Sequence, residues 1–271
     1  MKNIFKLDRF GKFLAYDLNN TWNQYGLSLL MIGLTPTIAV IINSVTHVVF
    51  SGSESSLSFG LGAFLSITAL ALLVAIIAGP QKIYGHVTDK KAGSDYILVP
   101  ASTFEKFSSM MVNVCVVIPV ALFIVFSLQY AAFKICVPGF NGGISDIISK
   151  IHEVTRGNDD FHVSDFSLAM GSWAVWTQNI LIFTLGAIFF KKSKAAKTIL
   201  AIMCVSFVFS MLTAGFFQIV DADSFEELFK RLFDNPKAVQ HFVNWFVNLA
   251  LIVPNAVLMA LIYLRLKTIK H

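Results

Sequence analysis

Six long apolar runs constrain this 271-residue chain more than any other feature of its sequence. None of them contains Asp, Glu, Lys or Arg, and each has close to the roughly 20 residues that cross about 30 Å of hydrocarbon. We therefore expect an all-α integral membrane protein with six transmembrane helices in a single domain, 1–271. The predicted spans are 27–50, 61–79, 110–133, 170–190, 198–217 and 245–264.

The composition supports this expectation. Hydrophobic residues make up 56% of the chain and charged residues 14%, against about 25% charged residues in a typical soluble domain. We find no internal repeat, low-complexity tract or separate soluble domain. Most of the chain is therefore expected to lie in the lipid bilayer.

The distribution of charge predicts the orientation in the membrane. Six crossings place both termini on one side, together with the segments 80–109 and 191–197. That side carries 15 of the 21 Lys and Arg residues, and the other side carries 11 of the 16 Asp and Glu residues. Because cytoplasmic segments are enriched in Lys and Arg, we expect cytoplasmic N- and C-termini. The net charge of +5 then needs no nucleic-acid partner.

The segment 5–25, before the first span, has a helical apolar pattern. Lys6, Arg9, Lys12 and Asp17 fall largely outside the apolar stripe, which predicts an interfacial amphipathic helix on the cytoplasmic leaflet. An amphipathic helix packed on protein is the alternative. The stripe consists of Phe10, Phe13, Leu14, Leu18, Trp22 and Tyr25.

The two longest external segments, 134–169 and 218–244, each contain a further amphipathic pattern. Apolar residues recur at helical spacing over 144–154 and over 224–235. We expect short outer helices at both places.

The cytoplasmic loop 80–109 contains a helix start signal. Ser102 is followed three residues later by Glu105, the pattern of a capping box. The loop is either a surface connector whose lysines contact lipid phosphates or a docking element that displays exposed side chains, including Tyr96 and Phe104, to a cytoplasmic partner. The candidate docking residues are Tyr96, Pro100, Ser102, Phe104, Glu105 and Lys106.

Sequence motifs for catalysis are missing. The chain has no P-loop, no HExxH and no GxSxG pattern, and its three Cys and six His residues lack metal-site spacing. We predict no catalytic residue, no cofactor and no metal ligand. Any ATP-driven work would therefore need a separate subunit.

The predicted spans contain amide side chains among their polar residues. Spans without carboxylates disfavour a proton-driven carrier, which mostly places ionisable residues within its spans. The amides either join helices or line a substrate path. They are Asn43, Asn113, Gln178, Asn179, Asn248 and Asn255.

The loop between the second and third predicted spans contains Gly93-Ser94 followed by Leu98-Val99-Pro100-Ala101-Ser102. With this loop, the amphipathic first helix and the six spans, the chain resembles the six-span permease subunits of type-2 ABC exporters. The resemblance implies a coupling helix at 102–107 that fits a groove on a separate cytoplasmic ATPase subunit. It also implies a homodimer or heterodimer of permeases that forms the substrate path. The external segment 135–169 is longer than the family pattern.

The resemblance thus implies a non-enzymatic permease subunit of an ATP-driven exporter in a bacterial-type inner (plasma) membrane, coupled to its ATPase through the segment 88–107. The alternative is a membrane scaffold or regulatory protein whose loop docks a partner that is not an ATPase. An ATPase that purifies with the chain distinguishes the two.

Overall fold

The computed structural model describes residues 5–51, 61–88, 93, 96, 98–136, 165–219 and 236–269, and the regular elements of these ranges are helices. In chain order they are α1 (Leu7–Gly33), α2 (Thr35–Ser51), α3 (Leu61–Tyr84), the 3-10 helix η1 (Gly85–Thr88), α5 (Thr103–Val112), the π-helical turn η2 (Asn113–Val117), α6 (Ile118–Cys136), α8 (Asp165–Phe189), α9 (Lys194–Ile219) and α11 (Pro236–Thr268).

Five helical stretches are long and apolar enough to cross a membrane. Five of the predicted spans overlap these stretches, and the other, 170–190, coincides with α8, in which Trp173–Phe189 is a shorter apolar stretch. Length and composition thus indicate a helical membrane protein, whereas a sixth crossing by α8 stays a prediction. The five stretches are Leu7–Asn43, Gly62–Thr88, Thr103–Ile135, Lys194–Gly215 and Leu249–Thr268.

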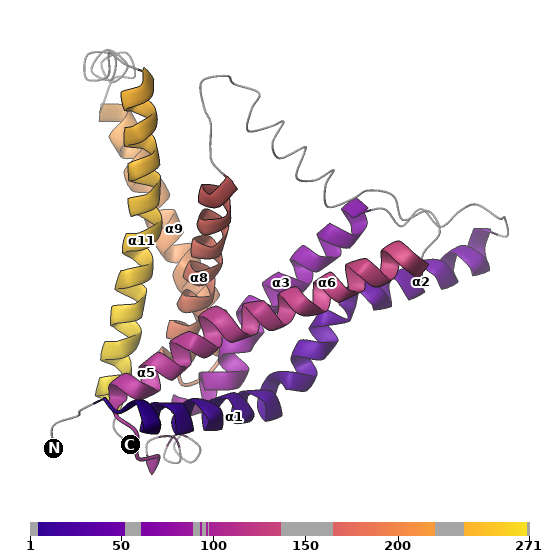
Figure 1. The fold of residues 1–271 in the computed structure, drawn as a ribbon. Helices are drawn as coiled ribbons and strands as arrows, with labels where there is room; N and C mark the ends of the chain where they lie inside the picture. The colour runs from indigo at the N-terminus through magenta and orange to yellow at the C-terminus, as the bar shows by residue number, and fades with distance from the viewer. Residues whose placement is uncertain are drawn as a thin grey trace.

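Helix α1 extends beyond the predicted end of the first helix, 5–25, into the predicted first span, 27–50. Helix α1 continues without a break to Gly33, and the chain turns at Leu34 before α2 begins. Pro36 explains the position of the turn, because its ring clashes with the carbonyl four residues earlier and its missing N–H is tolerated in the first turn of a new helix. Figure 1 shows α2 leaving α1 at this bend.

The face of α1 that packs on protein also differs from the predicted apolar stripe. Trp22 of that stripe is 58% exposed, whereas Asp17 and Thr21 are buried. Asp17 and Thr21 have hydrogen-bond partners on α3, α5 and η2, which stabilises their burial, and an exposed Trp is well suited to a membrane interface. The buried residues of α1 are Phe13, Asp17, Thr21, Tyr25, Gly26, Leu29 and Gly33.

Two groups of helices diverge from a common end (Figure 1). Helices α1, α2, α3 and the continuous α5–α6 helix slant to one side, and α8, α9 and α11 stand on the other. Helix α8 joins the groups by packing on both α11 and α3. The rings of Phe5 and Tyr263 both contact Phe104, with centroids 5.7 and 6.5 Å away. Both ends of the described chain therefore meet near the start of α5.

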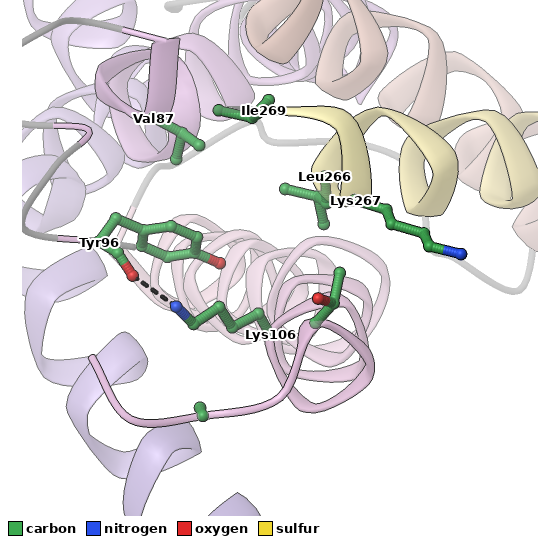
Figure 2. Close-up of a pocket in the computed structure, with 8 residues that line it drawn as sticks. Val87, Tyr96, Lys106, Leu266, Lys267 and Ile269 are labelled. Carbon is green, nitrogen blue, oxygen red and sulfur yellow. Dashed lines mark hydrogen bonds between the residues drawn. The ribbon is translucent and has the colours of Figure 1, made fainter. Parts of the chain in front are cut away.

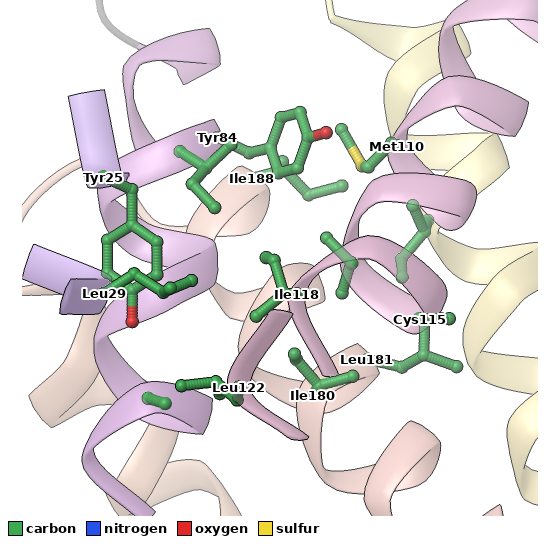
Figure 3. Packing of buried hydrophobic residues seen from close by; sticks show 14 of the residues in the cluster. Tyr25, Leu29, Tyr84, Met110, Cys115, Ile118, Leu122, Ile180, Leu181 and Ile188 are labelled. Carbon is green, nitrogen blue, oxygen red and sulfur yellow. The ribbon is translucent and has the colours of Figure 1, made fainter. Parts of the chain in front are cut away.

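An apolar core fills the region where the two groups meet (Figure 3). Helices α1, α3, α5, α6, α8 and α11 all contribute side chains to it. Its central members are shielded from solvent and lipid alike, so their packing stabilises the chain wherever the bilayer lies. The largest fully buried apolar side chains include Tyr25, Tyr84, Met110, Ile118, Leu122, Ile180, Leu181, Ile188 and Ile262.

The connection between α8 and α9 is short and close-packed. Ser193 has a positive φ of 51°, which lets the chain reverse within a few residues. Gly186 faces Thr198 so closely that a Cβ at position 186 would overlap the threonine side chain. A glycine at position 186 therefore allows α9 to start directly against α8.

The predicted outer helices at 144–154 and 224–235 lie outside the described residues. The described chain resumes in α11 at Pro236 and stays helical to Thr268, so α11 contains the whole predicted span 245–264.

Candidate functional site

The capping box at the start of α5 is confirmed. The Ser102 Oγ accepts a hydrogen bond from the Glu105 N–H at 3.2 Å, and the Glu105 Oε2 accepts one from the Ser102 N–H at 2.7 Å. These bonds satisfy backbone groups that a helix start otherwise leaves open. Helix α5 thus has a fixed beginning.

Glu105 also attaches α5 to the start of α1. Its Oε2 accepts from Arg9 Nε at 2.8 Å, and its Oε1 accepts from an Arg9 terminal nitrogen at 2.8 Å and from the Lys6 N–H at 3.0 Å. The carboxylate side chain is fully buried, while the Arg9 side chain is 38% exposed. Two parallel charge-assisted bonds fix orientation as well as distance. Glu105 therefore fixes the start of α5 relative to the start of α1 through buried hydrogen bonds.

Two further positions join α5 and η2 to α1. Asp17 Oδ2 accepts a hydrogen bond from the Ser109 hydroxyl at 2.7 Å, and Thr21 Oγ1 accepts one from Asn113 Nδ2 at 2.5 Å. Glu105, Ser109 and Asn113 are spaced by four residues, and all three are fully buried. We call this set the polar seam. Its members are Arg9, Asp17, Thr21, Glu105, Ser109 and Asn113.

Tyr84 of α3 extends the polar seam to a third helix. Its hydroxyl donates to Asp17 Oδ2 at 2.9 Å and accepts from Asn113 Nδ2 at 2.9 Å. Donors from α3 and α5 thus converge on the Asp17 carboxylate, which forms no ion pair within the described part of the chain. Because a buried polar group without a partner is costly, each bond constrains where the three helices sit.

The π-helical turn η2 begins at Asn113. Such a turn contains one residue more than an α-helical turn and is frequently found at functional sites. Ser109 and Asn113 bond to α1. Met110, Ile118 and Leu122 lie in the apolar core on both sides of this turn.

The structure divides the six candidate docking residues into buried and exposed groups. The prediction that Tyr96 is exposed is wrong, because only 6% of it is accessible, and Ser102 and Glu105 are buried as well. Pro100 is exposed, Phe104 is 51% exposed and Lys106 is half-buried. The residues that a partner can contact are therefore those at the tip of the loop, and the buried ones hold that tip in place.

An apolar patch surrounds the tip of α5. Phe5, Leu7, Leu98 and Phe104 are all exposed, with Leu7 and Leu98 more than three-quarters accessible. The Phe104 ring contacts Phe5 edge-on at 5.7 Å. We call these four residues the tip patch.

The amides predicted to join helices or line a path lie in different surroundings. Asn113 joins helices as described, and Asn255 Nδ2 donates to the Ala174 carbonyl of α8 at 3.1 Å. Gln178 is half-buried, Asn179 is exposed and donates to Val175 of its own helix, and Asn43 is exposed. The Asn248 side chain lies outside the described residues.

The sequence reasoning missed Asp17, Tyr84, Ser109 and the pairing role of Arg9. One signal was available, because Glu105, Ser109 and Asn113 recur every four residues and mark a polar helix face that enters the apolar span. The partner of each residue lies far away in sequence and gives no local signal. Within the ranges described, no three His, Cys, Asp or Glu side chains gather closely enough to hold a metal ion.

The fold and the site define a helical membrane-type chain in which buried hydrogen bonds join α1, α3 and α5 at one end. No family model, curated protein or solved structure matches it.

Proposed function

We propose that this chain is the permease subunit of an ATP-driven exporter in an inner membrane, coupled to a separate cytoplasmic ATPase through the tip of α5. In this proposal both termini and the loop are cytoplasmic, and two permeases pair to form the substrate path. The observation that carries the proposal is the tip itself: a capped, internally anchored helix start that displays an exposed Phe104.

Rigid anchoring supports a coupling role because a displacement of the tip is then transmitted. Helix α5 continues through η2 into α6, and the stretch Thr103–Ile135 is 33 residues long. A partner that pushes on Phe104 acts on this whole helix. The polar seam passes the same displacement to α1 and α3, because Asp17 and Tyr84 are bonded to it.

The tip patch supports docking on protein. Exposed aromatic and aliphatic side chains around a fixed centre are typical of interface anchors, of which a few supply most of the binding energy. In this proposal hydrolysis resides in the partner. The exposed amides Asn43 and Asn179 then face the path between the two permeases.

The test is recovery of the partner from native membranes with Phe104→Ala and a control, Phe123→Ala. Phe123 is 72% exposed on α6, away from the tip. We expect a co-purifying protein that hydrolyses ATP, and at least tenfold less of it with Phe104→Ala at equal membrane abundance. The Phe123→Ala variant should retain it.

Two results would contradict the proposal. One is equal recovery of the partner with both variants. The other is a Phe104-dependent partner that cannot hydrolyse ATP, which would favour the scaffold or regulatory function instead.

A further inference from the structure

A cavity of about 210 Å³ lies beside the tip of α5, between η1, Tyr96 and the end of α11 (Figure 2). It is separate from the polar seam, because none of the seam residues lines it. It is smaller than the roughly 300–1,000 Å³ typical of pockets for drug-sized ligands. A single chemical group, such as a lipid headgroup, is of suitable size. The lining residues are Val87, Tyr96, Ala101, Thr103, Lys106, Leu266, Lys267 and Ile269.

The Tyr96 hydroxyl points to a ligand. The residue is only 6% exposed, and its hydroxyl is buried without a hydrogen-bond partner. Figure 2 shows this hydroxyl directed into the space between Leu266 and Lys106. A buried hydroxyl without a partner is unfavourable, so a ligand that accepts a hydrogen bond from it would recover that loss. Burial raises the pKa of Tyr96 well above its ordinary value, and the hydroxyl therefore remains a donor at neutral pH.

The positive charge of the cavity wall favours an anionic ligand. Lys106 donates to the Tyr96 carbonyl at 2.7 Å, which holds its ammonium in the wall, and Lys267 lies exposed on the last turn of α11. No carboxylate is among the described residues that line the cavity. The neighbouring Glu105 is turned toward α1 and is paired with Arg9. Thr103 adds a hydroxyl that can donate to an oxygen ligand.

The location of the cavity selects a lipid as the source of that anion. One candidate membrane-crossing stretch begins at Thr103, and another ends at Thr268. The start of the first and the end of the second border the cavity. Headgroups lie at this level of a bilayer, and basic pockets between helices on the cytoplasmic side are typical sites for anionic headgroups. Val87, Leu266 and Ile269 provide an apolar wall for the glycerol part.

We infer that this cavity binds the phosphate group of an anionic phospholipid headgroup, with Tyr96, Thr103 and Lys106 as its donors and Lys267 as a positive charge at its edge. The site does not depend on an ATPase partner. It places a bound lipid directly between α5 and α11, so an occupied site links the two groups of helices next to the tip.

The test measures binding of dihexanoyl phosphatidylglycerol to the purified full chain in detergent, by native mass spectrometry and by thermal stabilisation. Tyr96→Phe removes the hydroxyl and keeps the ring, and should weaken binding about tenfold or more, as expected for a lost hydrogen bond to a charged group. Lys267→Ala should weaken it severalfold. Lys197→Ala, which removes an exposed lysine of α9 that does not line the cavity, should change it less than twofold.

Inorganic phosphate and glycerol 3-phosphate, each added alone, identify the source of the phosphate. Much weaker binding of both than of the lipid supports the headgroup. Equal affinity for inorganic phosphate would overturn the lipid assignment in favour of a free phosphate. Lipid binding that is unchanged in both Tyr96→Phe and Lys267→Ala would overturn the site, and so would the absence of saturable lipid binding by the purified chain.

Discussion

Along α1 and α5, polar side chains are buried and paired, whereas along α9 apolar side chains are exposed on nearly every side. Glu105, Ser109 and Asn113 are inaccessible, and each bonds a residue of α1. In the most apolar 18-residue stretch of α9, only 6% of the residues are buried. Phe207 and Phe209 are more than 60% exposed. The polar seam holds itself together within one chain. In the proposed function, the exposed apolar surface of α9 would be covered by lipid or by a second copy of the chain.

This difference assigns separate tasks to the two regions. Directional bonds at three levels of α5 permit one arrangement of α1, α3 and α5, which a coupling element requires. Apolar contacts with lipid are not directional, so α9 can shift or change neighbours at little cost. The proposed permease would use both kinds of helix.

The strongest test of the polar seam is Asp17→Ala. It leaves the Tyr84 and Ser109 hydroxyls buried without their acceptor, at about 1–3 kcal/mol each. We expect a clear fall in the thermal unfolding temperature in detergent. Asp17→Asn keeps an acceptor oxygen and should lose less, and Ser206→Ala on exposed α9 should unfold as the unaltered chain does. Equal unfolding temperatures for Asp17→Ala and Ser206→Ala would show that the seam does not stabilise this end.

A second prediction compares apolar side chains in the two regions. Ile180 of α8 is fully buried, so Ile180→Ala should destabilise by about 2–5 kcal/mol. Phe207→Ala removes a larger side chain, yet it should change stability by no more than about 0.5 kcal/mol, since Phe207 is 63% exposed. Both are read from unfolding of the detergent-solubilised chain. A comparable loss at Phe207 would mean that α9 packs on protein, as in a dimer.

The positions of the helices follow well from the sequence, because an uncharged apolar run of about 20 residues has few alternatives in lipid. The helix start at Ser102 could be predicted equally well, because a capping box is formed by residues three apart. The buried face of α1 could not be predicted from local sequence. Asp17 resembles a solvated surface residue until Ser109, 92 positions later, is placed beside it.

The exposure of the loop residues also could not be predicted from local sequence. Tyr96 lies in a charged, polar stretch and was expected at the surface, but its ring packs against Phe13 of α1 and His86 of η1, with centroids 6.1 Å away in both cases. Only the fold brings these elements to one place. Pro100 and Phe104, at the tip of the same loop, are exposed as a docking role requires.

The most direct measurement is labelling of Phe104→Cys by a membrane-impermeant maleimide, in a chain whose three cysteines are replaced. A coupling tip on the cytoplasmic side should be labelled in inside-out vesicles washed free of peripheral proteins. It should be protected in unwashed vesicles and unreactive in right-side-out vesicles. A Phe123→Cys variant controls for reaction within the apolar face. Labelling of Phe104→Cys only in right-side-out vesicles, or equal labelling with and without the peripheral proteins, would contradict the proposed coupling role.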